Sequence, residues 1–178
     1  MQLFDAIRAR ASYRGAFSST PVPLDHLLTI AEAACLAPSG CNRQTPRFIL
    51  VDNPVFIREI SAIIVKEKVA GAGAVLVFCM EKGQEYAVED CAAAVENALL
   101  ALTAYGYVSC WIDGALRSGE RAGRMAALLG VPDAYAVRVI LPVGHPAEDP
   151  KPPEKMPFEE RVFYNRFGDS AKAPEGLL

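Results

Sequence analysis

The stretch DCAAAVENALLALTAY, residues 90–105, is apolar around most of the circumference of a helix. One stripe at helical spacing is formed by Val88, Cys91, Ala92, Val95, Leu99 and Leu102, and a second row is formed by Ala93, Leu100, Ala101 and Ala104. A helix without a wide polar face is buried on more than one side. We therefore predict a helix over 86–105, capped by Gly106, with one flank on a sheet and the other on a second subunit. The alternative is a central helix in the core of a monomer.

Helical patterns and short apolar runs alternate on both sides of this helix. The run AVLVFCM, residues 74–80, is apolar throughout, which predicts a strand that is buried on both faces. The other expected strands are 48–51, 108–112 and 137–143, and the other expected helices are 3–10, 24–36, 55–69 and 120–129. This alternation predicts one domain over residues 1–178, an α+β or α/β sandwich around one central sheet, with a Pro-rich C-terminal extension from about residue 146.

The composition excludes several classes of protein. With 178 residues, 52% of them hydrophobic, the chain can build a core and is not a disordered protein. A net charge of −3 argues against a nucleic-acid partner. No apolar run approaches the roughly 20 residues that span a bilayer, and the N-terminus MQLFDAIR lacks the apolar stretch of a signal peptide. We expect a cytoplasmic protein with no membrane partner.

The cysteines and histidines give little support to metal or nucleophile chemistry. The five cysteines include no Cys-x-x-Cys pair, and Cys35, Cys79 and Cys91 lie in apolar runs where cysteine is usually a core residue. Only His26 and His145 are available for a zinc site or a Ser-His-Asp triad. We therefore expect no metal site, no Ser-His-Asp triad and no cysteine nucleophile.

Three polar segments each allow a functional and an ordinary structural interpretation. RASYR, residues 10–14, offers guanidinium groups to a phosphate, although cations also stabilise helix C-termini. APSGCNRQ, residues 37–44, is either a loop suited to an amide-rich heterocycle or a plain polar turn. WIDG, residues 111–114, lies at the end of an expected strand, where glycine permits a close ligand and aspartate can also be a turn cap. GAG, residues 71–73, precedes a strand, so it indicates neither a Rossmann fingerprint nor a P-loop.

These segments, in this order, resemble the FMN-dependent nitroreductase family. The resemblance continues through DCAAAVENALL at 90–100, GYVSCWIDG at 106–114 and KMPFEERVFYNRFG at 155–168, and so covers nearly the whole chain. It implies an α+β fold, a three-layer sandwich with a central mixed, mainly antiparallel sheet flanked by helices. It also implies a homodimer with two FMN sites in the subunit interface.

The resemblance further implies which residues bind the cofactor. Arg10 and Ser12 would bind the phosphate and ribityl end of FMN, and Lys155 would also meet the phosphate. Arg14 would lie near the pyrimidine edge of the flavin, and Lys68 near its N1 and C2 carbonyl. A cation at N1 would stabilise the negative charge of the reduced flavin.

Two further segments complete the implied site. The 37–44 loop of the other subunit would reach the same flavin through Pro38, Ser39, Gly40 and Asn42. The backbone at Asp113 and Gly114 would face N5, the atom that accepts and returns hydride.

The implied activity is an NAD(P)H oxidoreductase that passes hydride through FMN to a small-molecule electron acceptor, such as a nitroaromatic or a quinone, by a ping-pong mechanism. NADH or NADPH would be the co-substrate. Two alternatives remain: a family relative with dehalogenating or flavin-degrading activity, and a flavin-binding dimer without turnover.

Overall fold

The fold is that of a computed structural model, in which the structure of residues 1–173 is described. Three strands form one sheet in the order β1 (Arg47–Val51), β2 (Ala74–Glu81) and β3 (Tyr135–Val143). Both pairs are antiparallel, so that Leu50 lies opposite Leu76, and Leu76 lies opposite Leu141. The helices are α1 (Leu3–Ala9), α2 (Leu24–Cys35), α3 (Pro54–Ile64), α4 (Ala87–Ala104) and α5 (Arg121–Leu129). Short 3₁₀ turns are η1 (Gly40–Asn42), η2 (Glu67–Gly71) and η3 (Phe158–Glu160).

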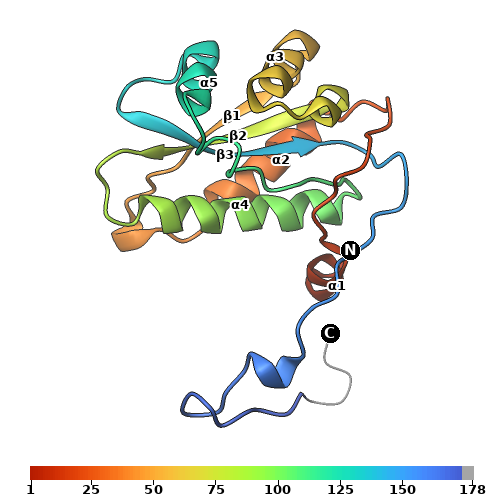
Figure 1. Ribbon diagram of the computed structural model, residues 1–178, viewed down its shortest axis with the longest axis vertical. Helices are drawn as coiled ribbons and strands as arrows, with labels where there is room; N and C mark the ends of the chain where they lie inside the picture. Colours follow the sequence, from red (N-terminus) through yellow and green to blue (C-terminus); the bar gives the residue numbers. More distant parts are fainter. Residues whose placement is uncertain (174–178) are drawn as a thin grey trace.

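The helices cover both faces of the sheet, which confirms the three-layer α+β sandwich. Figure 1 shows α2 and α4 on one face and α3 and α5 on the other. The central strand β2 is buried from Ala74 to Cys79, as its apolar run predicted. A strand that is covered by helices on both sides must be apolar on both faces, because neither face meets water.

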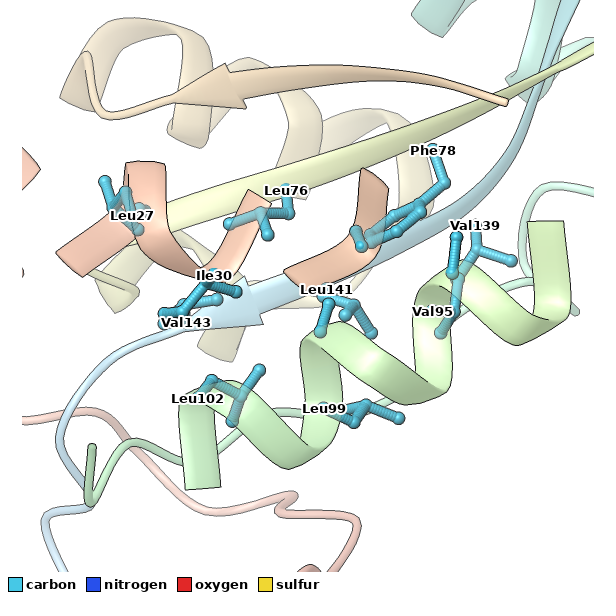
Figure 2. Close-up of a cluster of buried hydrophobic side chains, with 14 of the residues drawn as sticks. Leu27, Ile30, Leu76, Phe78, Val95, Leu99, Leu102, Val139, Leu141 and Val143 are labelled. Atoms are coloured by element: carbon cyan, nitrogen blue, oxygen red, sulfur yellow. The ribbon is translucent and has the colours of Figure 1, made fainter. Parts of the chain in front are cut away.

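Alternation along β2 divides the core into two clusters. Leu76 and Phe78 face α2 and α4, whereas Val75 and Val77 face α3 and α5. Figure 2 shows the first cluster, in which side chains from the sheet meet Leu27 and Ile30 of α2 and a row along α4: Val95, Leu99 and Leu102. The predicted central helix therefore packs one flank on the sheet.

The end of α4 is fixed by Gly106, as predicted. Gly106 has φ +83°, its N–H donates to the carbonyl of Thr103 at 2.9 Å, and the N–H of Tyr107 donates to the carbonyl of Leu102 at 2.9 Å. This pair of bonds is the Schellman arrangement, in which a left-handed residue satisfies the last carbonyls of a helix. It turns the chain sharply into the segment that follows.

Two predicted elements are wrong in extent. The helix expected over 55–69 ends at Ile64, because Val65 takes a left-handed conformation with φ +54°. The strand expected over 108–112 is reduced to single bridges, including Val108 with Gly144 and Ile112 with Ile140. The three strands are wholly antiparallel, and the parallel pairing that a mixed sheet requires is confined to one bridge between Ser12 and Ser109.

Two segments project from the sandwich. Figure 1 shows α1 and the extension that follows β3 on the same side of the molecule, beyond α4. Their large apolar side chains are exposed: Leu3, Phe4 and Ile7 in α1, and Met156, Val162, Tyr164 and Phe167 in the extension. None of the described helices is both long and apolar enough to cross a bilayer.

Candidate functional site

The larger of the two cavities that concern the predicted site lies between the RASYR segment, η2 and the 110–112 segment. Its volume is about 400 Å³, which falls in the range of small-molecule sites. We call it the basic cavity, because three of its lining residues are basic and only one is acidic. The lining residues are Tyr13, Arg14, Gly15, Phe17, Val65, Lys66, Glu67, Lys68, Val69, Cys110, Ile112 and Pro142. Its walls are otherwise largely apolar or aromatic.

The basic cavity brings together two predicted cofactor residues that are far apart in the sequence. Lys68 Nζ donates a hydrogen bond to the backbone carbonyl of Arg14 at 3.1 Å, and both residues line the cavity. The early end of α3 makes this possible. Past Val65, the N–H of Lys66 donates to the carbonyl of Ser61 at 3.1 Å, and Ser61 Oγ donates back to the carbonyl of Lys66 at 2.8 Å. Lys68 therefore lies on η2 rather than on a continuous helix.

Arg10 and Ser12 do not line the basic cavity, although Tyr13 and Arg14, which follow them in the chain, do. Arg10 Nε is 3.6 Å from Glu96 Oε1 of α4, and Ser12 pairs with Ser109 in the parallel bridge. Ser109 is 1% exposed, and its Oγ has no hydrogen-bond partner among the described residues. Arg10 and Ser12 are thus close in sequence to residues of the cavity, and the Arg10 side chain is paired with α4.

The 37–44 loop lines a second cavity of about 240 Å³, which we call the loop cavity. Pro38 and Ser39 are among its lining residues, together with Ala34, Cys35, Ala37, Gln44, Pro46, Arg47, Phe48, Asp90 and Ala94. Ser39 Oγ accepts a hydrogen bond from the N–H of Gln44 at 2.9 Å. The two cavities share no lining residue, so one chain divides the predicted cofactor residues between two places.

Asp113 belongs to a cluster of charges at the end of the 110–112 segment. Its Oδ2 accepts hydrogen bonds from Arg117 and, at 3.2 Å, from Arg138 of β3. Partial burial raises the pKa of Asp113, but the hydrogen bond and charge of Arg117 and the charge of Arg138 outweigh it, so the net pKa is lowered. Asp113 and Gly114 do not line the basic cavity, although Ile112 does.

Lys155 lies exposed in the extension and lines neither cavity.

Three further side chains, which the sequence did not mark as candidates, belong to the two cavities. Cys110 and Lys66 line the basic cavity, and Asp90 is buried behind the loop. Asp90 is the first residue of the DCAAAVENALL motif. Its hydrogen bond with Gly40, 50 residues earlier in the chain, has no signal in the sequence.

Comparisons with known proteins agree with this architecture. The model of the Nitroreductase family matches residues 7–68 and 63–145. An Archaeoglobus fulgidus protein named "Putative NADH dehydrogenase/NAD(P)H nitroreductase" is 32% identical over 149 residues, which are 80% of this chain and 84% of that protein. The iodotyrosine deiodinase of Thermotoga neapolitana is 30% identical over 193 residues, covering 93% of this chain and 98% of that protein.

Solved structures share the fold. A protein from Parabacteroides distasonis with the same name as the archaeal one has a TM-score of 0.84 at 23% identity, covering 94% of this chain and 99% of that chain. The NADPH:FMN oxidoreductase of Vibrio harveyi has a TM-score of 0.81 at 24% identity, covering 93% of this chain and 77% of that chain. The chain belongs to the nitroreductase family and is an oxidoreductase.

The basic cavity fits the cofactor that the family resemblance implies. A flavin combines a broad apolar ring system with an anionic phosphate, and the cavity combines apolar walls such as Phe17, Ile112 and Pro142 with a basic excess. Cations on a largely apolar cavity favour an anionic ligand, because they offset the loss of its hydration.

Proposed function

We propose that the protein is an FMN-dependent NAD(P)H oxidoreductase of the nitroreductase type. The observation that carries the proposal is the meeting of Arg14 and Lys68 on one cavity of about 400 Å³ with apolar walls. The order of the family motifs along the chain and the family membership support it.

In this proposal Arg14 and Lys68 hold the flavin ring edge, and Arg10, Ser12 and Lys155 hold the ribityl phosphate. Arg10 is paired with Glu96 of α4, and its side chain stays partly exposed. The backbone at Asp113 and Gly114 is assigned to N5, on a segment that is tied to β3 by two hydrogen bonds between Ile112 and Ile140.

The proposed site is completed by a second copy of the chain. Pro38, Ser39, Gly40 and Asn42 would reach the flavin from the partner, since Pro38 and Ser39 line the loop cavity and none of the four lines the basic one. Exposed apolar side chains on α1 and on the extension support a homodimer, because such surfaces are usually covered by a partner. The second row on α4 is half-buried at Ala93, Leu100 and Ala101, which leaves room for such a contact.

The bound flavin would supply the redox chemistry, accepting hydride from NADH or NADPH and passing it to an electron-poor acceptor such as a nitroaromatic or quinone. The chain binds and orients, and no side chain is assigned as a catalytic acid or base. Donor and acceptor would use the same face in turn, which gives ping-pong kinetics. We place this activity in the cytoplasm.

A visible spectrum of natively purified protein tests the proposal, followed by anaerobic addition of NADH and of NADPH. We expect a yellow protein that bleaches rapidly with at least one donor and regains colour with a nitroaromatic. A flavin that is bound but not bleached would favour a binding dimer without turnover. Colourless protein that also fails to bind added FMN would refute the proposal.

Reductive dehalogenation is the second candidate function, and one observation favours it. The deiodinase from Thermotoga neapolitana matches 93% of this chain at 30% identity. Steady-state assays with nitroaromatic, quinone and halogenated acceptors on the same preparation distinguish the two activities. Release of halide at a rate comparable to nitro reduction would support dehalogenation.

A further inference from the structure

The loop between α2 and β1 has an unusual backbone. Cys41, Asn42 and Gln44 have φ of +52°, +54° and +51°, the left-handed region that residues with a Cβ seldom adopt. Three such residues within four positions would relax to other conformations unless the surrounding structure held them. Strain of this kind is concentrated at functional sites, where it is maintained by contacts from outside the strained segment.

One buried carboxylate supplies such contacts at both ends of the loop. Asp90 of α4 is 4% exposed; its Oδ1 accepts the N–H of Gly40 at 2.8 Å and its Oδ2 accepts the hydroxyl of Thr45 at 2.7 Å. Thr45 is itself 2% exposed. The two oxygens thus tie the start of the loop to its end, and a buried carboxylate makes strong hydrogen bonds.

The ring of Tyr86, just before α4, presses the same loop from another side. A Cβ on Gly40 would overlap that ring, so the backbone at Gly40 approaches α4 as closely as only glycine allows. Within the loop, Ser39 Oγ accepts the N–H of Gln44. The position of the loop is therefore determined by α4 and the residues before it, rather than by the loop alone.

We infer that Asp90 is a positioning residue, which holds the 39–45 loop in the shape in which Ser39, Gly40 and Asn42 meet the flavin. This inference rests on the proposed function. Both carboxylate oxygens of Asp90 are already bonded to the loop, so the inferred role is on the loop and not on the cofactor. It acts through the backbone of Gly40 and the hydroxyl of Thr45, and it fixes the strained residues between them.

Tryptic cleavage after Arg43 measures the order of the loop without any flavin. Arg43 is exposed within the loop, so cleavage after it reports how often the loop opens. We expect Asp90→Ala to speed this cleavage about tenfold, because it leaves a half-buried N–H and a buried hydroxyl without an acceptor. Asp90→Asn should restore most of the protection, since its amide can accept from Gly40 and donate to Thr45.

FMN affinity, measured by fluorescence quenching on the apoprotein, is the second readout. Asp90→Ala should weaken FMN binding about tenfold, and Thr45→Val about threefold, whereas Asp90→Asn should stay near the wild type. The control is Ile60→Val, a buried change on α3 across the sheet, which lowers stability without touching the loop. It should leave both cleavage after Arg43 and FMN affinity unchanged.

Unchanged cleavage in Asp90→Ala would overturn the inference, as would faster cleavage with unchanged FMN affinity. Equal loss of affinity in Asp90→Ala and Ile60→Val would also overturn it, because the role would then be general stability. Wild-type protein that binds no FMN would refute the proposed function and this inference with it. Wild-type binding together with normal binding by Asp90→Ala refutes the inference alone.

Discussion

At the scale of single residues, Asp113 carries the clearest pH dependence. Its carboxylate is shared by Arg117 and Arg138, and its side chain is 25% exposed. Asp113→Asn should lower the free energy of unfolding at pH 7 by about 1 kcal/mol, after allowance for solvent screening. Urea unfolding of both proteins measures this difference.

The sign of the pH dependence follows from the lowered pKa of Asp113. A carboxyl whose pKa is lower in the folded state stabilises the fold above its unfolded pKa of about 4. The stabilisation is lost as the pH falls through the lowered folded value, so wild type and variant should converge in strong acid. Asp5→Asn, which breaks an exposed pair with Arg8, is the control and should change stability by less than about 0.5 kcal/mol. A difference between Asp113→Asn and wild type that grew in acid would contradict this account.

Removal of one cation, Lys68, tests the electrostatics of the basic cavity. Lys68→Ala should weaken FMN binding about tenfold and lower the midpoint potential of the bound flavin, because a nearby positive charge favours the reduced, more negative form. Fluorescence titration and spectroelectrochemistry measure the two effects. Lys82→Ala removes an exposed lysine that lines neither cavity, and it should change neither value. A normal potential in Lys68→Ala would remove Lys68 from the flavin site.

At the scale of elements, the glycine that ends α4 can be compared with a glycine inside α5. Gly106→Ala places a Cβ at φ +83° and should cost about 1 kcal/mol. Gly123→Ala lies in α5, where a Cβ would meet no neighbour, and should stabilise by up to about 1 kcal/mol. Thermal unfolding of both variants gives the comparison. Equal effects of the same sign would show that the Schellman turn does not limit stability.

Elements with a long, regular pattern could be predicted from the sequence. Helix α4 and the buried strand β2 were predicted within one or two residues, because each is set by burial that its own pattern shows. The end of α3 could not be predicted in this way, since Val65 favours neither a turn nor a left-handed conformation. There the bonds of Ser61 with Lys66 decide the geometry. The 108–112 segment is apolar like a strand, but it pairs with its neighbours only at single bridges.

The candidate site could be predicted only in part, for the same reason. Arg14 and Lys68 meet at the basic cavity, whereas Asp113 is shared by Arg117, four residues later in the chain, and by Arg138, which only the fold brings near. Pro38 and Ser39 line a different cavity, and Lys155 lies out in the extension. Cys35 was expected in the core, but it is exposed at the end of α2. Partners distant in the chain determine the contacts of Lys68 with Arg14 and of Asp113 with Arg138.

At the scale of the whole molecule, the exposed apolar surface of α1 predicts dimerisation. Phe4 is 59% exposed, and Phe4→Asp should shift the protein toward monomer and reduce FMN retention, since a charge is costly to bury in an interface. Sedimentation velocity and the flavin absorbance per chain measure the two effects. Val55→Asp on α3 is the control: Val55 is 50% exposed, in the outer layer on the other face of the sheet. A dimer that tolerated Phe4→Asp would place the interface elsewhere.

The separation of the basic cavity from the loop cavity has a genetic consequence under the proposed dimer. Each site would draw its cations from one copy and its loop from the other. A copy altered at Lys68 and a copy altered at Asp90 would each have two weakened sites in a pure population. Coexpressed, they would assemble one wholly sound site and one doubly defective site per mixed pair. Two impaired alleles would then partly restore FMN binding to each other, which mutations that merely unfold the chain would not do.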